Sequence, residues 1–112
     1  LALDPFPYNG GTTSTHSLWM GVPVLSLAGG HAVSRVGASV LSRAGLQEFI
    51  THSEEAYFQR ALQIAEDLPG LNQIRQSLRK RLGNTGCAAS NITRELETSY
   101  REMWRTWCAA RP

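Results

Sequence analysis

Two short apolar runs, each followed by a glycine-rich turn and then a helical pattern, constrain the fold of this chain most. Residues 1–3 (Leu-Ala-Leu) and 22–27 (Val-Pro-Val-Leu-Ser-Leu) have the composition of buried strands. Helical patterns begin after each turn, at Thr12 or Thr13 and again near Val33. The order strand, loop, helix, repeated twice, predicts an α/β fold with parallel strand pairing.

Three more helical patterns follow these two units. The full set of predicted helices covers residues 12–20, 33–43, 51–68, 71–82 and the stretch from 91 onward. We expect Pro69-Gly70 to separate the third helix from the fourth, and residues 83–90 to form a loop. Because two strands are too few for a free-standing parallel sheet, the sequence predicts a fragment of a Rossmann-like doubly wound domain, with two short parallel strands and about five helices.

Length and charge exclude several classes of protein. The chain has 112 residues and a formal net charge of +2, which predicts one small domain without a nucleic-acid partner. No apolar run is long enough to span a bilayer, and residues 1–7 lack the pattern of a signal peptide, so we expect no membrane association. Two cysteines, Cys87 and Cys108, are too few for a disulfide framework or a metal cluster. The basic cluster on residues 75–81 lacks interleaved aromatic residues, which favours a solvated helix face.

The strongest local signal for a binding site is the run Asn-Gly-Gly-Thr-Thr at residues 9–13, after a predicted strand and at the start of a predicted helix. A helix N-terminus offers free N–H groups and partial positive charge to a phosphate, and glycines allow its close approach. The alternative is an ordinary helix cap on a glycine-rich turn. The run is neither a Walker motif nor Gly-x-Gly-x-x-Gly.

Three histidines are weaker candidates. His16 lies one turn into the first predicted helix, on the side of Thr12 and Thr13, so it either faces a ligand at the helix start or is a surface residue. His31 follows the second strand and fits a loop histidine, and His52 adjoins a helix cap. We find no metal-binding motif and no complete catalytic constellation in the chain.

Four segments of the chain combine into a recognisable pattern. They are residues 3–13 (Leu-Asp-Pro-Phe-Pro-Tyr-Asn-Gly-Gly-Thr-Thr), 18–24 (Leu-Trp-Met-Gly-Val-Pro-Val), 34–39 (Ser-Arg-Val-Gly-Ala-Ser), and the closing helix with Glu95, Tyr100, Met103 and Trp104. Together these segments resemble the O-GlcNAc transferase/SPINDLY family. Any one segment is a weak signal, whereas the combination is specific and spans nearly the whole chain.

The resemblance implies that residues 1–112 are the C-terminal part of the nucleotide-sugar-binding second domain of a GT-B glycosyltransferase. It implies transfer of a sugar to Ser or Thr hydroxyls of proteins, with inversion and without a metal or other cofactor. The donor is UDP-GlcNAc in most of the family and GDP-fucose in the SPINDLY branch. A first catalytic domain and tetratricopeptide repeats would lie upstream in a cytoplasmic protein. The closing helix would cross onto that first domain, so without it part of the helix's aromatic face is expected to be exposed or used for self-association.

The resemblance also implies roles for single residues. Thr12 and Thr13 would hold the donor diphosphate, Gly11 stands where some members have His, and Tyr8 and Asn9 would line the sugar side of the loop. The other active-site groups would lie upstream, so we assign no catalytic residue here and expect the isolated fragment to be inactive.

His16 departs from the family pattern. The family usually has Asp or Glu at this position, whose carboxylate accepts hydrogen bonds from both ribose hydroxyls, whereas a neutral imidazole has one acceptor nitrogen and an imidazolium has none. The alternative to an enzyme is therefore a non-catalytic protein-interaction module derived from such a domain.

Overall fold

The structure, a computed structural model, describes residues 1–84 and 89–110 and confirms the α/β class. Its sheet contains three parallel strands in the order β1 (Ala2–Leu3), β2 (Val24–Leu27) and β3 (Ile50–Thr51). Ala2 pairs with Val24, and Ser26 pairs with Ile50. The sequence predicted only two strands, because a two-residue strand such as β3 is too short to show an alternating pattern.

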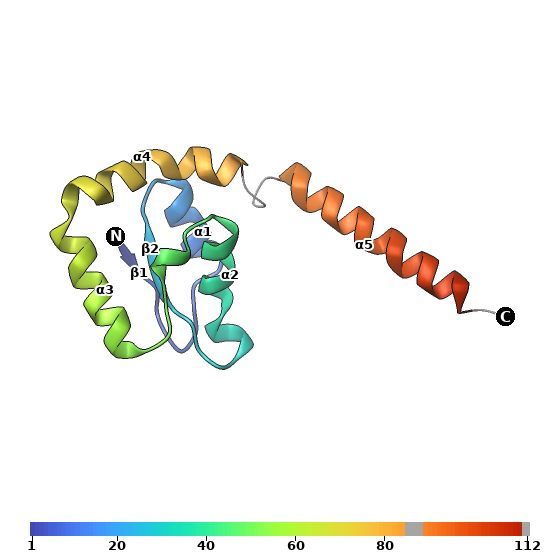
Figure 1. Ribbon diagram of the computed structural model, residues 1–112, viewed down its shortest axis with the longest axis horizontal. Helices are drawn as coiled ribbons and strands as arrows, with labels where there is room; N and C mark the ends of the chain where they lie inside the picture. The colour runs from blue at the N-terminus through green and yellow to red at the C-terminus, as the bar shows by residue number, and fades with distance from the viewer. Residues whose placement is uncertain (85–88, 111–112) are drawn as a thin grey trace.

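Four α-helices pack around this sheet: α1 (Thr12–Trp19), α2 (Val36–Arg43), α3 (Glu54–Glu66) and α4 (Leu68–Asn84). A fifth helix among the described residues, α5 (Ala89–Ala109), does not cover the sheet. In Figure 1 the strands lie between α1 and α2 on one side and α3 on the other, while α4 crosses from α3 to α1. All four residues of β2 are buried, as expected for the central strand of a covered parallel sheet. Because β1 and β2 are parallel, the loops that follow them lie at the same edge of the sheet, the one formed by the carboxyl ends of the strands. Ligands bind at this edge in folds of this class.

The hydrophobic core packs β2 against helices α1 to α4. Its buried members are Leu18, Val24, Leu25, Leu41, Ala44, Leu46, Phe49, Ile64, Leu78 and Leu82. On the outer surface, the guanidinium group of Arg79 lies 4.9 Å from the centre of the Trp19 ring and links α4 to α1. Arg75, Lys80 and Arg81 are exposed as well, which agrees with a solvated helix face.

The helix predicted over residues 33–43 is divided in two. A 3₁₀ turn at Ala32–Ser34 precedes α2. The Ser34 hydroxyl donates to the His31 carbonyl (2.9 Å) and accepts from the His31 N–H (3.1 Å). Such local side-chain bonds compete with helical ones, so the turn closes on itself before α2 begins.

The predicted helix break at Pro69-Gly70 is wrong. The chain turns instead at Asp67, and both residues lie in the first turn of α4, where proline is tolerated because its missing N–H would have no helical partner. The Asp67 carboxylate accepts a hydrogen bond from the Gly70 N–H (2.9 Å), which caps this helix start.

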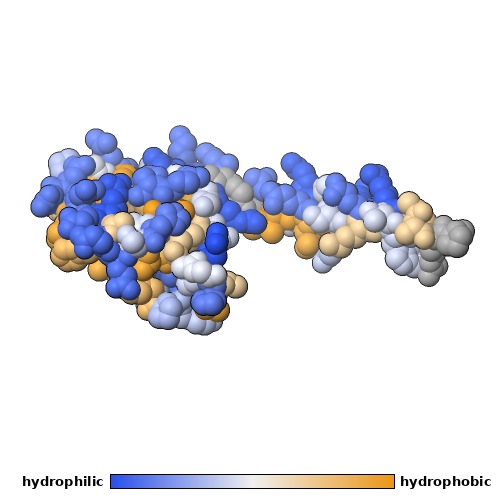
Figure 2. Space-filling model, turned by 60° about the horizontal axis from the view of Figure 1, so that its bottom comes forward, coloured by the Kyte–Doolittle hydropathy of each residue, from blue (hydrophilic) through white to orange (hydrophobic). Residues whose placement is uncertain are grey.

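Helix α5 extends away from the rest of the molecule (Figure 1). Its apolar side chains form a row along one side of the helix (Figure 2), and the rings of Trp104 and Trp107 stack with their centres 5.0 Å apart. No residue of α5 is buried, and Tyr100, Trp104 and Trp107 are all exposed. The expectation that part of the aromatic face is exposed is thus confirmed.

The loop predicted over residues 83–90 lies only partly within the described residues. Helix α4 continues to Asn84, α5 starts at Ala89, and Cys87 lies outside the described part of the chain. Cys108 is exposed and has a free thiol. Among the described helices, none combines the length and apolarity that crossing a membrane requires.

Candidate functional site

The loop between β1 and α1 is organised around the buried carboxylate of Asp4, of which only 3% is exposed. Its Oδ1 atom accepts hydrogen bonds from the Gly10 N–H (2.8 Å) and the Ser14 hydroxyl (3.1 Å). Its Oδ2 atom accepts one from the Ser26 hydroxyl (2.6 Å) on β2. A buried charge needs such partners, so this carboxylate joins the loop, the first helix and the central strand at one point.

Two glycines make room for this arrangement. A Cβ atom added to Gly10 would lie 2.5 Å from the Ser14 Oγ and 2.6 Å from the Thr13 Oγ1. A Cβ atom added to Gly37, in the first turn of α2, would collide with Ser26 Oγ and Asp4 Oδ2. Both positions require glycine for lack of space.

Asn9 supports the loop from inside. Only 2% of the residue is exposed, its amide nitrogen donates to the Pro5 carbonyl (3.0 Å), and its Oδ1 atom accepts from the Gly37 N–H (3.4 Å). Burial turns this side chain inward, where it ties the loop to α2. That Asn9 also lines the sugar side of the loop stays a prediction.

The start of α1 is open. Gly11 occupies the N-cap position, and no side chain caps the helix. The backbone N–H groups of Thr12, Thr13 and Ser14 have no hydrogen-bond partner among the described residues, whereas the next N–H, of Thr15, donates to the Gly11 carbonyl (3.0 Å). Three unpaired donors at the positive end of a helix dipole form an arrangement that can accept an anion.

The remaining predicted side chains are accessible around this helix start. Thr12, Thr13 and His16 are exposed on α1, and Tyr8 is 71% exposed on the loop. The supporting residues Asp4, Ser14, Ser26 and Gly37 were missed as site residues. One signal could have indicated Asp4: it is the only acidic residue in the first 34 positions, and it directly follows a strand.

Tyr57 of α3 reaches the same loop from the other side of the sheet. Its hydroxyl donates to the Asp4 main-chain carbonyl (3.0 Å), and its ring meets the Phe6 ring edge-on, with centres 5.6 Å apart. Burial and, to a lesser degree, the charge of Asp4 raise the pKa of Tyr57 above its ordinary value of 10.0.

This shift predicts an alkaline loss of stability. Folding favours the neutral phenol, so the stabilisation is complete below pH 10.0 and is lost as the pH rises through the raised pKa. In urea unfolding between about pH 8 and 11.5, we expect the unfolding free energy of the wild type to fall more steeply at high pH than that of Tyr57→Phe. Tyr100→Phe, at an exposed tyrosine of α5, is the matched control. Parallel curves for wild type and Tyr57→Phe would contradict the assignment.

The cavity beside the start of α1 is too small to enclose a whole ligand. A cavity of about 140 Å³ lies beside α1, lined by Ala2, Leu3, Asp4, Pro5, Thr13, Ser14, Ser17 and Val24. It is smaller than the roughly 300–1,000 Å³ of typical small-molecule sites, so a ligand at α1 would need further residues around it to be enclosed.

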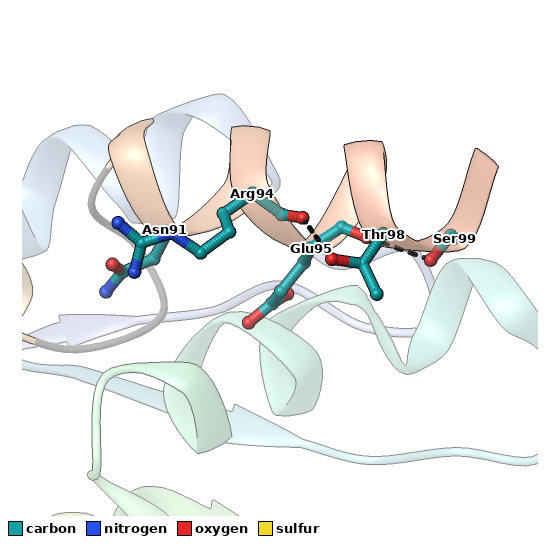
Figure 3. A pocket seen from close by; sticks show the side chains of 5 residues that line it. All are labelled: Asn91, Arg94, Glu95, Thr98 and Ser99. Carbon is teal, nitrogen blue, oxygen red and sulfur yellow. Dashed lines mark hydrogen bonds between the residues drawn. The ribbon is translucent and has the colours of Figure 1, made fainter. Parts of the chain in front are cut away.

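A larger hollow of about 520 Å³ lies on α5 (Figure 3), but all five of its lining residues come from that one helix. The Thr98 and Ser99 hydroxyls there bond to the carbonyls of Arg94 and Glu95, within the helix, so we assign no site to it.

Comparison with known proteins assigns this chain to a family. The sequence model of glycosyl transferase family 41 matches residues 1–91. The chain belongs to this family. The match confirms the resemblance to the O-GlcNAc transferase/SPINDLY family that residues 3–13, 18–24 and 34–39 and the closing helix indicate.

Individual members of family 41 agree with this assignment. The chain is 42% identical over 109 residues to the probable UDP-N-acetylglucosamine–peptide N-acetylglucosaminyltransferase SPINDLY of Oryza sativa subsp. japonica, and covers 12% of it. It is 34% identical to the probable enzyme of the same activity named SEC in Arabidopsis thaliana, and covers 11% of it. In both cases 96% of this chain is matched. A solved mutant of the Thermobaculum terrenum O-GlcNAc transferase is 43% identical, with a TM-score of 0.86 over 97% of this chain and 21% of that one.

Proposed function

We propose that this chain is the donor-binding part of a protein O-glycosyltransferase, in which the start of α1 holds the diphosphate of a nucleotide sugar. The observation that carries the proposal is the open helix start, with three unpaired N–H groups beside two threonine hydroxyls, in a member of glycosyl transferase family 41. In this proposal residues 1–112 are the C-terminal part of the nucleotide-sugar domain, and other parts of a longer protein supply the remaining walls and the acceptor site.

The chemistry of sugar transfer gives these groups a role in the reaction. As the bond between sugar and diphosphate breaks, negative charge grows on the departing diphosphate. Donors that are already oriented toward that charge stabilise the transition state more than the ground state. We assign this role to the N–H groups of Thr12 and Thr13 and to their hydroxyls, with Gly11 allowing close approach and Tyr8 lying beside the sugar. Inversion at the sugar, without a metal ion, belongs to the same proposal.

The donor and the acceptor are proposed at the level of chemical class. We take UDP-GlcNAc as the first candidate donor because the similar proteins are named as N-acetylglucosaminyltransferases, and GDP-fucose as the second. The acceptors are Ser or Thr hydroxyls of proteins. Transfer of radiolabelled sugar from each donor to protein, by the full-length enzyme, tests both. Transfer from neither donor, with no binding of UDP or GDP, would favour the non-catalytic interaction module that His16 suggests.

His16 provides a second test of the site. It is exposed one turn along α1 from Thr12, so a ribose attached to the diphosphate would lie near its imidazole. In the full-length protein we expect His16→Ala to weaken donor binding by roughly 1–2 kcal/mol, because a ribose hydroxyl loses its partner. We expect His16→Asp to match or exceed the wild type, because its carboxylate has two acceptor oxygens.

Isothermal titration with UDP and with GDP measures these affinities. Ser39→Ala, at an exposed position of α2, is a control that should bind as the wild type does. An affinity of His16→Ala equal to that of the wild type would make His16 a surface residue with no role in donor binding.

A further inference from the structure

We propose that Asp4 is a positioning residue for donor binding, which holds the β1–α1 loop so that the first N–H groups of α1 stay unpaired and available to the diphosphate. The inference rests on the proposed function and extends it to a residue that does not itself contact the donor. Asp4 is the only charged side chain among the buried residues of the described chain.

The first step of the argument is what Asp4 leaves unpaired. An acidic or hydroxyl side chain near a helix start ordinarily accepts hydrogen bonds from the second or third N–H of the helix and thereby occupies them. The Asp4 carboxylate instead accepts from the Gly10 N–H, just before the helix, and from the Ser14 hydroxyl. Both bonds hold the start of α1 in place, and neither uses a backbone N–H group of the first turn of that helix.

The second step is that the carboxylate is itself oriented by the sheet. The Ser26 hydroxyl of β2, which is fully buried, donates to Oδ2 at 2.6 Å. The backbone of Gly37 packs against both partners and leaves no room for them to move toward α2. The central strand therefore sets the direction of the carboxylate, and the carboxylate sets the position of the Gly10 peptide. Support of this kind improves the preorganisation of a charge-binding site.

A purely structural role for the same bonds predicts a different result, so the test separates stability from binding. In the full-length protein, Ser26→Ala removes the hydroxyl that orients the carboxylate. Thr51→Val is the matched control: the Thr51 hydroxyl is also buried, on the neighbouring strand, and donates to the Ser26 carbonyl (3.1 Å) without touching Asp4. Asp4→Asn keeps one acceptor oxygen for Gly10 and Ser14, whereas Asp4→Ala removes both.

We expect Ser26→Ala and Thr51→Val to lower Tm by similar amounts. Of these two variants, only Ser26→Ala should raise the Kd for UDP and GDP and the KM for the nucleotide sugar, by about tenfold. The KM for the acceptor should not change. The Kd should increase in the order wild type, Asp4→Asn, Asp4→Ala. If Asp4→Ala does not fold, Asp4→Asn and Ser26→Ala decide the question.

Two results would overturn the inference. One is a Kd for Thr51→Val that rises as much as that for Ser26→Ala, because binding would then follow stability alone. The other is an unchanged Kd in both folded Asp4→Asn and Ser26→Ala. A failure of the proposed function is recognised separately, by UDP and GDP failing to bind the wild type or binding equally well when the helix start itself is altered.

Discussion

Replacing Gly11 by Asp is expected to make the protein more stable and to abolish most of its affinity for the donor. Gly11 is the N-cap of α1, and a Cβ atom added there would meet only the Val36 side chain, at an ordinary 3.6 Å. An Asp side chain at this position would accept hydrogen bonds from the free N–H groups and stabilise the helix by about 1 kcal/mol. The same carboxylate would occupy the proposed diphosphate site and repel its charge. We expect the affinity of the full-length protein for UDP and GDP to fall by on the order of a hundredfold, at ~1.4 kcal/mol for each factor of ten.

Two neighbouring variants distinguish charge from space. Gly11→Asn caps the helix with a neutral side chain, so it should stabilise the fold similarly and lose less affinity than Gly11→Asp. Gly11→Ala adds only a methyl group and should bind within a few-fold of the wild type, since the added carbon has room. Thermal melts and nucleotide titrations of the three proteins measure both quantities. Undiminished binding by Gly11→Asp would show that the diphosphate lies elsewhere, and the proposed site would be wrong.

Replacing Phe49 by Ala is expected to be the most destabilising single truncation in the core. Phe49 is completely buried, ends the 3₁₀ turn Gln47–Phe49 directly before β3, and carries the Arg60 guanidinium 5.9 Å from its ring centre. Removal of a buried phenylalanine ring typically costs about 3–5 kcal/mol, because the cavity that remains does not close fully. For a small domain with a total stability of roughly 5–15 kcal/mol, such a loss leaves a large unfolded population.

The control for this prediction is an exposed phenylalanine on α3. Phe58 on α3 is 57% exposed, so Phe58→Ala should change the unfolding free energy by only about 0.5 kcal/mol or less. Urea unfolding of the 112-residue chain gives both values, provided that the variants share the same dependence of unfolding free energy on urea concentration. Equal losses for the two variants would contradict the core described here.

Local patterns in the sequence account for the parts of the fold that depend on near neighbours. The run Gly-Gly-Thr-Thr predicted the start of α1, because glycine in a turn and a hydroxyl residue at a helix start act within a few residues. The continuous apolar run at residues 22–27 predicted the buried central strand for the same reason. These two elements also indicated where the exposed residues of the site lie, on α1 and on the loop before it: Tyr8, Thr12, Thr13 and His16.

Only the tertiary structure decided the residues that support the site. Its supporting bonds join Asp4 to Ser26, 22 residues apart, Asn9 to Gly37, 28 apart, and Tyr57 to Asp4, 53 apart. No periodicity reports a contact over such a separation, and a polar residue beside a glycine-rich turn fits an exposed ligand contact as well as a buried support. The strand β3 was hidden for a related reason: two residues become a strand here because β2 lies beside them. The sequence by itself thus determined where the helix start and its accessible side chains lie, whereas packing of distant segments determined which polar side chains turn inward to hold it.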